Sequence, residues 1–365
     1  MGYLGRLYHL IDLSTALVPY HFVKSGRAFT PLRVALMVTH RCNLRCAMCM
    51  IVEREAELRE KDLSTNELKL ILHKIPSRTL ITFTGGEPFV RRDIIDLMHH
   101  ASRNHRINVI TNGVLLNDEK ISQLLALAPK RVFQKGLILV GVSVQGIGEV
   151  HDAVVRVKGA FDKVRANLLK FREERKKWGK SLPLLDIKSV ITDENVEQMD
   201  KLVDLAEEMG ADFCTFQIVN TQDSSYGIED VPEEAYQTPP PPVRFTKIDA
   251  LRTQLAKIEE RRKKVPFEIR FNPILPPEEI VKRYQNAVHI EDYGCYVPWS
   301  TAHIGPTGNL FPCYSINCGN LLEKSFDEAW NGPVFREFRR KLREAEIFPG
   351  CEGCCFISYR GKRKK

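Results

Sequence analysis

Three cysteines with the spacing CxxxCxxC, Cys42, Cys46 and Cys49, stand early in the chain. They come directly after the apolar run 34–38, which predicts a short buried strand. Thiolates gathered in one loop suit a soft metal centre, and iron–sulfur clusters are held by such thiolates. Three ligands on a four-iron cube leave one iron open to a substrate or cofactor. A zinc site or three buried structural cysteines is the alternative.

The chain has ten cysteines, and they are grouped. Six of them lie between Cys295 and Cys355, and only Cys214 stands between the two groups. The sequence has no convincing signal peptide, so we expect a reducing, cytoplasmic location. In that setting grouped thiols indicate metal binding rather than disulfides.

Three polar motifs follow predicted strands and could bind a ligand. These are Thr84-Gly85-Gly86-Glu87-Pro88 after the second strand, Thr111-Asn112-Gly113 after the third and Ser143 after the fourth. Paired glycines let the backbone approach a ligand closely. Loops at the carboxyl ends of parallel strands present N–H and C=O groups to a common site.

With these motifs, the cysteine loop resembles the cluster loop of the radical S-adenosylmethionine (SAM) superfamily. The resemblance implies that the open iron chelates the amino and carboxylate groups of SAM. It also implies that SAM is split by an electron from the cluster into methionine and a 5′-deoxyadenosyl radical. The implied SAM-binding residues are Gly85, Gly86, Glu87 and Pro88 for the amino group, and Thr111 and Asn112 near the ribose and carboxylate.

The stretch from Ser143 to Gly159 is similar to an S-x-D-G…H-D…R-x-x-G pattern in members of this family. The resemblance implies that Ser143 and Arg156 hold the SAM carboxylate, a task that suits the bidentate geometry of a guanidinium. Gln145 stands where the pattern has an aspartate, so the role of that acid is not carried over. No catalytic acid or base is assigned, and His151 is not interpreted as one.

The C-terminal cysteines match the opening Cys…Gly-xxxx-Cys of SPASM domains. A full SPASM domain holds two auxiliary [4Fe–4S] clusters, whereas this sequence ends ten residues after Cys355. We therefore expect one auxiliary cluster, as in the shortened "twitch" form. The implied ligands are Cys295, Cys313, Cys351 and Cys354. Cys318 and Cys355 are spare and could replace a ligand, and a four-cysteine zinc site is the alternative.

Composition and charge narrow the class of protein. The 365 residues are 43% hydrophobic and 27% charged, with a net charge of +8, which is typical of a soluble globular protein. The basic runs 261–264 and 360–365 lack interleaved aromatic residues, so we expect no nucleic-acid partner. Apolar residues recur at helical spacing between Leu4 and Val18. That pattern predicts an N-terminal helix that covers the core or, alternatively, lies on a membrane surface.

Strand and helix patterns alternate along the middle of the chain. Strands are predicted at 34–38, 80–83, 107–110, 137–142, 184–191 and 213–219, and helices at 63–75, 93–104, 118–127, 161–177, 195–210 and 247–264. This alternation predicts an α/β fold with a parallel sheet, a partial (β/α)6 barrel. The predicted parts are an N-terminal amphipathic helical segment (1–30), the partial barrel (31–220), a linker and helix (221–284) and a small SPASM/twitch-like iron–sulfur domain (285–365).

The resemblance implies a radical SAM enzyme that removes hydrogen from an unactivated C–H bond. The substrate is left open among an alcohol or other small molecule, a peptide and a lipid, and peptide maturation is a specific alternative. The electron donor is expected to be a flavodoxin or ferredoxin. The competing hypothesis is a non-catalytic iron–sulfur electron carrier or scaffold, for which the SAM-binding motifs would be unnecessary.

Overall fold

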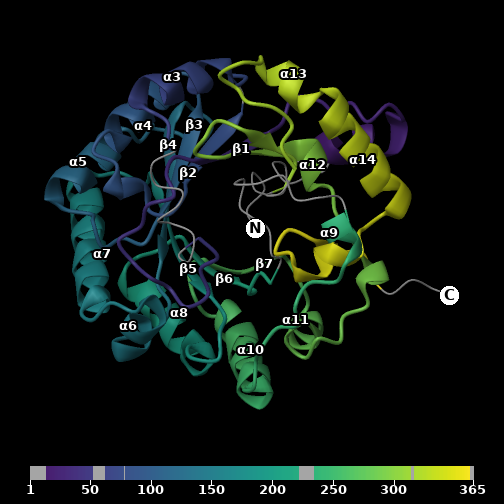
Figure 1. Ribbon diagram of the computed structural model, residues 1–365. Coiled ribbons are helices and arrows are strands. Elements are labelled where there is room, and N and C mark those ends of the chain that lie inside the picture. The colour runs from purple at the N-terminus through teal and green to yellow at the C-terminus, as the bar shows by residue number, and fades with distance from the viewer. Residues whose placement is uncertain (1–13, 52–61, 78, 222–233, 314–315, 362–365) are drawn as a thin grey trace.

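The strands of the protein form an open barrel. The computed structural model describes residues 14–51, 62–77, 79–221, 234–313 and 316–361. In these residues one nine-stranded sheet has the order β10-β9-β1-β2-β3-β4-β5-β6-β7 (Figure 1). The strands are β1 (Arg33–Met37), β2 (Leu80–Thr84), β3 (Arg106–Thr111), β4 (Gly136–Ser143), β5 (Leu184–Val190), β6 (Phe213–Gln217), β7 (Glu268–Asn272), β9 (Thr301–Ile304) and β10 (Leu310–Phe311). All neighbours are parallel except β9 and β10.

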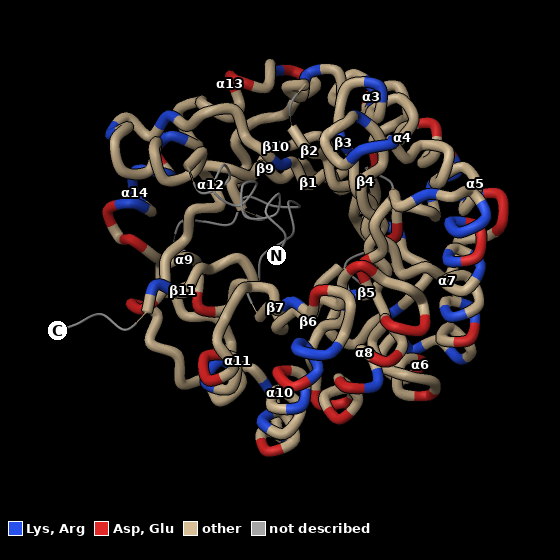
Figure 2. The backbone as a smooth tube through the Cα atoms, turned by 180° about the vertical axis from the view of Figure 1, so that it is seen from behind, with Lys and Arg blue, Asp and Glu red and all other residues tan. Residues whose placement is uncertain are grey.

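Helices cover the outer face of this sheet (Figure 1). The outer helices are α3 (Thr65–Lys74), α4 (Ile94–Ser102), α5 (Asp118–Ala126), α6 (Glu149–Val155), α7 (Ala160–Lys177), α8 (Met199–Glu208), α10 (Ile248–Arg262) and α11 (Pro277–Tyr284). Ser64 and Glu67 form the capping box that begins α3. Lys, Arg, Asp and Glu are frequent along the outer helices (Figure 2).

The six predicted strands are all present as β1 to β6, and the predicted helices correspond to α3, α4, α5, α7, α8 and α10. Two parts of the sheet were not predicted. The sequence interpretation placed no strand in 221–284, where β7 pairs with β6. It also placed no strand beside β1, where β9 from the C-terminal region pairs. The sequence of β7, Glu-Ile-Arg-Phe-Asn, does alternate polar and apolar residues, but it is only five residues long and lies in a stretch that was interpreted as linker and helix.

The two faces of the strands differ in chemistry. Outward side chains such as Ile81, Val109 and Ile187 are buried in the hydrophobic core against the helices. Successive residues of a strand point to opposite faces, so the polar residues between them line the barrel interior. Because β1 to β7 run in the same direction, their carboxyl ends meet at one edge, where the predicted motifs lie.

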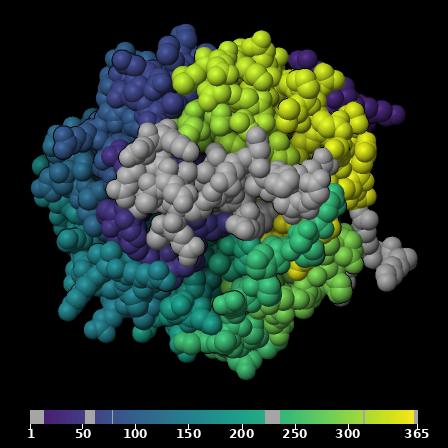
Figure 3. Space-filling view, viewed as in Figure 1, coloured from purple at the N-terminus to yellow at the C-terminus, as the bar shows by residue number. Residues whose placement is uncertain are grey.

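Residues far apart in the sequence lie side by side: in the space-filling view the blue α3 region borders the yellow-green part of the chain, and purple N-terminal residues border the yellow C-terminal part (Figure 3). The Nζ of Lys74 in α3 donates to the carbonyl of Leu321 at 2.6 Å. A helix over residues 14–22 buries Ala16 and Tyr20. The Tyr20 ring makes an edge contact with Trp299 at 4.9 Å in α12 (Val297–Ser300). Residues 14–22 therefore cover an edge of the core, while residues 1–13 lie outside the described part.

Arg339 joins the C-terminal helices to the N-terminal segment. It lies in α14 (Pro333–Ala345), is fully buried, and donates to the carbonyls of Pro298 at 2.7 Å, Gly26 at 3.1 Å and Trp330 at 2.9 Å. Trp330 ends α13 (Phe326–Trp330), and its ring lies 4.2 Å from the guanidinium carbon. This side chain thus satisfies carbonyl groups from three segments at once.

We expect Arg339→Met to destabilise the fold by about 2–4 kcal/mol, because it leaves several buried carbonyls without donors. Chemical denaturation would measure the change. Arg340→Met is the matched control, since Arg340 lies on the same helix and, among the residues that the structure describes, pairs only with Glu337 in an exposed ion pair. Equal free energies of unfolding for the two variants would contradict this account of Arg339.

Candidate functional site

The loop that follows β1 carries Cys42, Cys46 and Cys49 and is fixed by backbone hydrogen bonds. Arg45 N donates to Val155 O at 3.1 Å, and Ala47 N donates to Val154 O at 2.9 Å, which ties the loop to the end of α6. Leu44 is buried in a small apolar cluster with Val155. The sequence therefore holds the cysteine loop against the β4–α7 connection.

The three thiols of this loop interact with one another. Burial raises the pKa of the Cys46 thiol to about 12, and the neighbouring Cys49 and Cys42 add to the rise, while Arg156 opposes it. Deprotonating a group of close thiols requires a compensating cation, which an iron cluster supplies. The donor set therefore fits the [4Fe–4S] cluster that the spacing predicts.

The glycine loop after β2 lies against the cysteine loop. Gly86 N donates to Thr39 O at 2.8 Å, and Glu87 N donates to Arg41 O at 2.8 Å. A Cβ on Gly85, whose φ is +144°, would lie 2.4 Å from Thr39 O, and one on Gly86 would lie 2.3 Å from Arg41 O. Both glycines are thus required for the close approach of the two loops. Pro88 begins the short helix η3 (Pro88–Val90) that follows.

Glu87 connects this loop to the end of β3. Its carboxylate is buried and accepts hydrogen bonds from Phe89 N at 3.0 Å, Thr111 Oγ1 at 2.8 Å and Asn112 N at 2.7 Å. Burial raises the pKa of Glu87, and these three donors oppose the rise. Glu87 therefore orients Thr111 and Asn112 in addition to any contact that it makes with a ligand.

Asn112 lies beside the first cysteine. Its Nδ2 donates to Asn43 Oδ1 at 2.9 Å and lies 3.9 Å from Cys42 Sγ, which also accepts from Leu44 N at 3.4 Å. Donors to a cluster thiolate tune its potential and fix its rotamer. Asn112 is thus placed to act on the Cys42 sulfur as well as on a cofactor next to it.

Ser143 ends β4, and Arg156 follows α6 in a left-handed conformation with φ of 57°. Asp152 holds the turn after Arg156 by accepting from Gly159 N and from Phe161 N at 2.8 Å. The Arg156 side chain is exposed and, among the described residues, has no hydrogen-bond or ion-pair partner. This cation beside Cys46 is therefore available to an anionic ligand.

Two polar residues of the same stretch have structural contacts. His151 is buried, and its Nδ1 accepts from Gln145 N at 2.9 Å. Burial lowers the pKa of His151 to about 4, an effect that Asp152 opposes. The Gln145 Oε1 accepts from Val190 N at 2.9 Å at the end of β5. A neutral His151 that orders this turn agrees with leaving it unassigned as a catalytic residue.

A second group of thiols gathers in the C-terminal part. Cys295 follows β8 (Tyr293–Gly294), Cys313 follows β10, and Cys351 and Cys354 belong to η6 (Pro349–Gly353) and its cap. Burial raises the pKa of Cys351, and Cys295 and Cys313 add to the rise. The pKa of the Cys354 thiol is raised as well, most by burial and then by Cys355, Cys351 and Cys295. These interactions indicate that the four predicted auxiliary ligands lie near one another, while no group of three or more side chains in the described residues has a metal-binding arrangement.

The spare cysteines have other surroundings. Cys318 is buried, and its thiol lies 3.7 Å from Ile316 O. Burial lowers the pKa of Arg339, and the nearby Cys318 opposes this change. Burial raises the pKa of Cys355 to about 11, while Arg283 and Lys188 oppose the rise. Cys355 therefore lies within electrostatic reach of Arg283 on α11 and of Lys188 on β5, and Cys318 lies within reach of Arg339 on α14.

Sequence analysis missed Asp62, which fixes the start of the cysteine loop. The carboxylate of Asp62 accepts from His40 N at 3.1 Å, from Arg41 Nε at 3.3 Å and from the Thr39 hydroxyl. No motif marks this residue in the sequence. It also missed Asp186, Lys188 and Arg270, which meet inside the barrel. In the sequence, these three residues could have been found as charged residues at alternate positions of strands that are otherwise mostly apolar.

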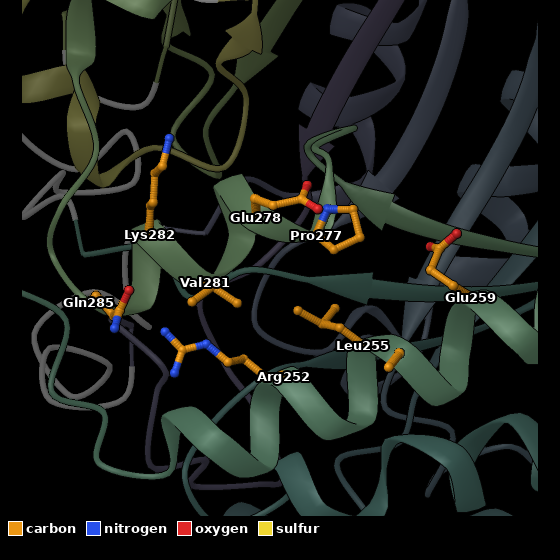
Figure 4. Close-up of a pocket in the computed structure, with 9 residues that line it drawn as sticks. Arg252, Leu255, Glu259, Pro277, Glu278, Val281, Lys282 and Gln285 are labelled. Carbon is orange, nitrogen blue, oxygen red and sulfur yellow. The ribbon is translucent and has the colours of Figure 1, made fainter.

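A cavity of about 550 Å³ lies elsewhere, between α10 and α11 (Figure 4). Its lining includes Arg252, Glu259, Glu278 and Lys282, a mixture of charges with no net sign. None of the predicted site residues lines it. Since both helices lie on the outer face of the sheet, this cavity is separate from the cysteine sites.

The sequence of the chain matches two known protein families. The Radical SAM superfamily matches residues 36–206, and a SPASM iron-sulfur cluster-binding domain matches residues 295–355. The Fe-coproporphyrin III synthase of Methanosarcina barkeri is 32% identical over 194 residues, which cover 52% of this chain and 44% of that enzyme. The match therefore spans less than half of that relative.

Two other relatives match over most of their length. The AdoMet-dependent heme synthase of Methanosarcina barkeri is 25% identical, over 89% of this chain and 88% of that enzyme. The PqqA peptide cyclase of Bradyrhizobium diazoefficiens is 27% identical, over 91% and 76%. In fold, the chain is similar to Streptococcus suis SuiB bound to S-adenosylmethionine, with a TM-score of 0.63 and 17% identity over 92% of this chain and 78% of that one.

Proposed function

Because the chain belongs to the radical SAM superfamily and carries a SPASM domain, we propose that it cleaves SAM reductively and removes a hydrogen atom from an unactivated C–H bond. The observation that carries the proposal is the contact between the Cys42–Cys49 loop and the glycine loop, with Arg156 beside Cys46 and without a partner in the described part of the chain. An electron carrier would need neither the glycine loop nor this cation.

Each residue of the site has its own proposed role. Cys42, Cys46 and Cys49 would hold a [4Fe–4S] cluster, which when bound supplies the electron that splits SAM into methionine and a 5′-deoxyadenosyl radical. The backbone of Gly85 and Gly86 would lie along the amino end of SAM. Arg156 and Ser143 would bind the SAM carboxylate through charge-assisted hydrogen bonds. Glu87 keeps Thr111 and Asn112 in place for the ribose side.

The second thiol set supports an oxidative reaction. Cys295, Cys313, Cys351 and Cys354 would hold an auxiliary cluster able to take up an electron or to bind the substrate. We propose that reduced flavodoxin or ferredoxin supplies the electron for SAM cleavage.

A peptide is our first candidate substrate, because the PqqA peptide cyclase matches over 91% of this chain. A tetrapyrrole is the second, because the AdoMet-dependent heme synthase matches over 88% of its own length. Deuterated candidates of each class would be incubated with the reconstituted protein, SAM and reductant. A substrate should accelerate 5′-deoxyadenosine formation and transfer deuterium into it. Acceleration without deuterium transfer would contradict direct hydrogen abstraction.

We also propose peripheral contact with a membrane through the N-terminal segment. In the described ranges no helix combines the length and apolar character needed to cross a bilayer. The helix over 14–22 nevertheless exposes Val18 by 41% and Phe22 by 80%, while its other face is packed on the core. Exposed apolar side chains beside Lys24 and Arg27 suit an anionic lipid surface.

Phe22→Asp is expected to weaken sedimentation with phosphatidylglycerol vesicles by about tenfold or more, since one buried phenylalanine contributes about 1.5–3 kcal/mol. Phe133→Asp is the control, because Phe133 is also exposed (56%) but lies in the connection between α5 and β4. Equal vesicle binding by wild type and Phe22→Asp would refute the contact.

A further inference from the structure

Three charged side chains meet inside the barrel on β5 and β7. The Asp186 carboxylate is buried and accepts from Lys188 Nζ at 3.2 Å and from Arg270 Nη2 at 2.9 Å, both on Oδ2. Its Oδ1 accepts from Thr215 Oγ1 on β6 at 2.7 Å. The intervening residues, Ile187 and Ile269, point to the core, so these polar groups face the interior.

The charges of this group do not balance. Two cations share one carboxylate, so the group carries one positive charge in excess. Glu268, on the same face of β7 as Arg270, forms no ion pair with either cation in the described part of the chain. The Lys188 and Arg270 side chains are 23% and 33% exposed, whereas that of Asp186 is 3% exposed. The cations therefore present donors to the interior, and the anion does not.

The surroundings hold both cations in place. The Arg270 guanidinium carbon lies 3.7 Å from the centre of the Phe213 ring, a cation–π contact that keeps it over β6. Lys188 passes over Gly141, where an added Cβ would lie 3.1 Å from Lys188 Cδ and 2.6 Å from Ile110 Cδ1. The glycine on β4 thus leaves room for the lysine chain.

These contacts are not needed to hold the strands together. β5 pairs with β6 over five residues, and β6 pairs with β7 over five, in unbroken parallel register. A network serving only the fold would be expected to pair its charges, because an unpaired charge in a partly dry interior is unfavourable. The excess charge instead indicates a missing anion.

We propose that Lys188 and Arg270 form an anion subsite in the barrel interior that binds a carboxylate of the substrate. The inference rests on the proposed function, since it places the substrate in the same barrel as SAM. Arg270 can donate to a carboxylate through Nη1, since the bond to Asp186 uses Nη2, and Lys188 can donate through its remaining N–H groups.

The subsite is distinct from the predicted SAM-carboxylate residues. Ser143 on β4 is paired in register with Lys188 on β5. The Lys188 ammonium, however, donates to Asp186, which is paired with Gly141, two residues before Ser143. Arg156 lies near Cys46, whose pKa it lowers, at the mouth of the barrel. A substrate carboxylate held by Lys188 and Arg270 would lie on the β5–β7 side of the sheet, across from the cysteine loop that follows β1.

The test uses glutarate as the probe and its neutral diamide, glutaramide, as the matched compound, with saturation-transfer NMR on the reconstituted full chain. We expect binding of glutarate and none of glutaramide. Lys188→Met or Arg270→Met should weaken glutarate binding about tenfold, the loss of one charge-assisted bond. Asp186→Asn should strengthen it about threefold or more, because a competing negative charge is removed. Lys257→Gln, which removes an outer-face ion pair with Asp200, should leave it unchanged.

Opposite signs for Asp186→Asn and Lys188→Met separate a subsite from a structural network, which would weaken binding in both variants. If Lys188→Met does not fold, Arg270→Met and Asp186→Asn carry the same comparison. Equal signals from glutarate and glutaramide would overturn the proposal, and so would full competition by SAM, which would assign the cations to its carboxylate. Glutarate binding by a protein that forms no 5′-deoxyadenosine would leave the subsite standing and reject the proposed function.

Discussion

Replacing Cys42, Cys46 and Cys49 together by alanine is expected to abolish SAM cleavage, lowering 5′-deoxyadenosine formation by at least about a thousandfold, because the cofactor carries the difficult step. The same variant should keep about four irons per chain on the C-terminal cysteines after anaerobic reconstitution. Iron analysis and chromatography of the SAM products would measure both results.

Cys214→Ala is the matched control for this variant. Cys214 is buried on the outer face of β6 and belongs to neither thiol group, so its loss should change neither iron nor product. Undiminished 5′-deoxyadenosine formation by the triple variant would refute the role of the loop. Zinc in place of iron on the remaining cysteines would refute an auxiliary cluster.

The double variant Cys351→Ala/Cys354→Ala has the second large expected effect. It removes two of the four predicted auxiliary ligands, so bound iron should fall from about eight to about four per chain. Cleavage of SAM in the absence of substrate should persist, because the Cys42–Cys49 loop is fixed by α6 and the glycine loop and not by these residues. Conversion of substrate should be lost.

Cys318→Ala tests the choice of ligands. Its thiol lies in the α14 contact with Arg339, so this variant should keep about eight irons. Loss of four irons in Cys318→Ala, or full iron in the double variant, would contradict the assignment. Cys355→Ala is informative in the same assay, because Cys355 is adjacent to Cys354 and acts on it.

The six barrel strands and their helices were predictable because each outward face is continuous with the core and gives an apolar run. β7 was not, since it is short and offers only two apolar buried residues, Ile269 and Phe271. The pairing of β9 with β1 joins residues almost 270 positions apart in the sequence, Arg33 with Thr301, and no local pattern encodes it.

The parts of the site that belong to a motif with a fixed residue spacing were predictable from the sequence. The cysteine loop and the glycine loop could be named from their motifs, and the structure brings them into contact. Asp62 could not, because a single carboxylate has no motif until the fold places it under Thr39 and Arg41. The different surroundings of Cys318 and Cys355 likewise depend on residues distant in the sequence, Arg339 for Cys318 and Arg283 with Lys188 for Cys355.

Formation of 5′-deoxyadenosine tests the central claim most directly. The full chain, reconstituted anaerobically with iron and sulfide, would be incubated with SAM and either dithionite or reduced flavodoxin, and the products separated by liquid chromatography with mass detection. The account predicts 5′-deoxyadenosine and methionine in equal amounts, and neither from the variant that lacks Cys42, Cys46 and Cys49. A protein that holds its iron and binds SAM but forms no 5′-deoxyadenosine with either reductant would contradict it.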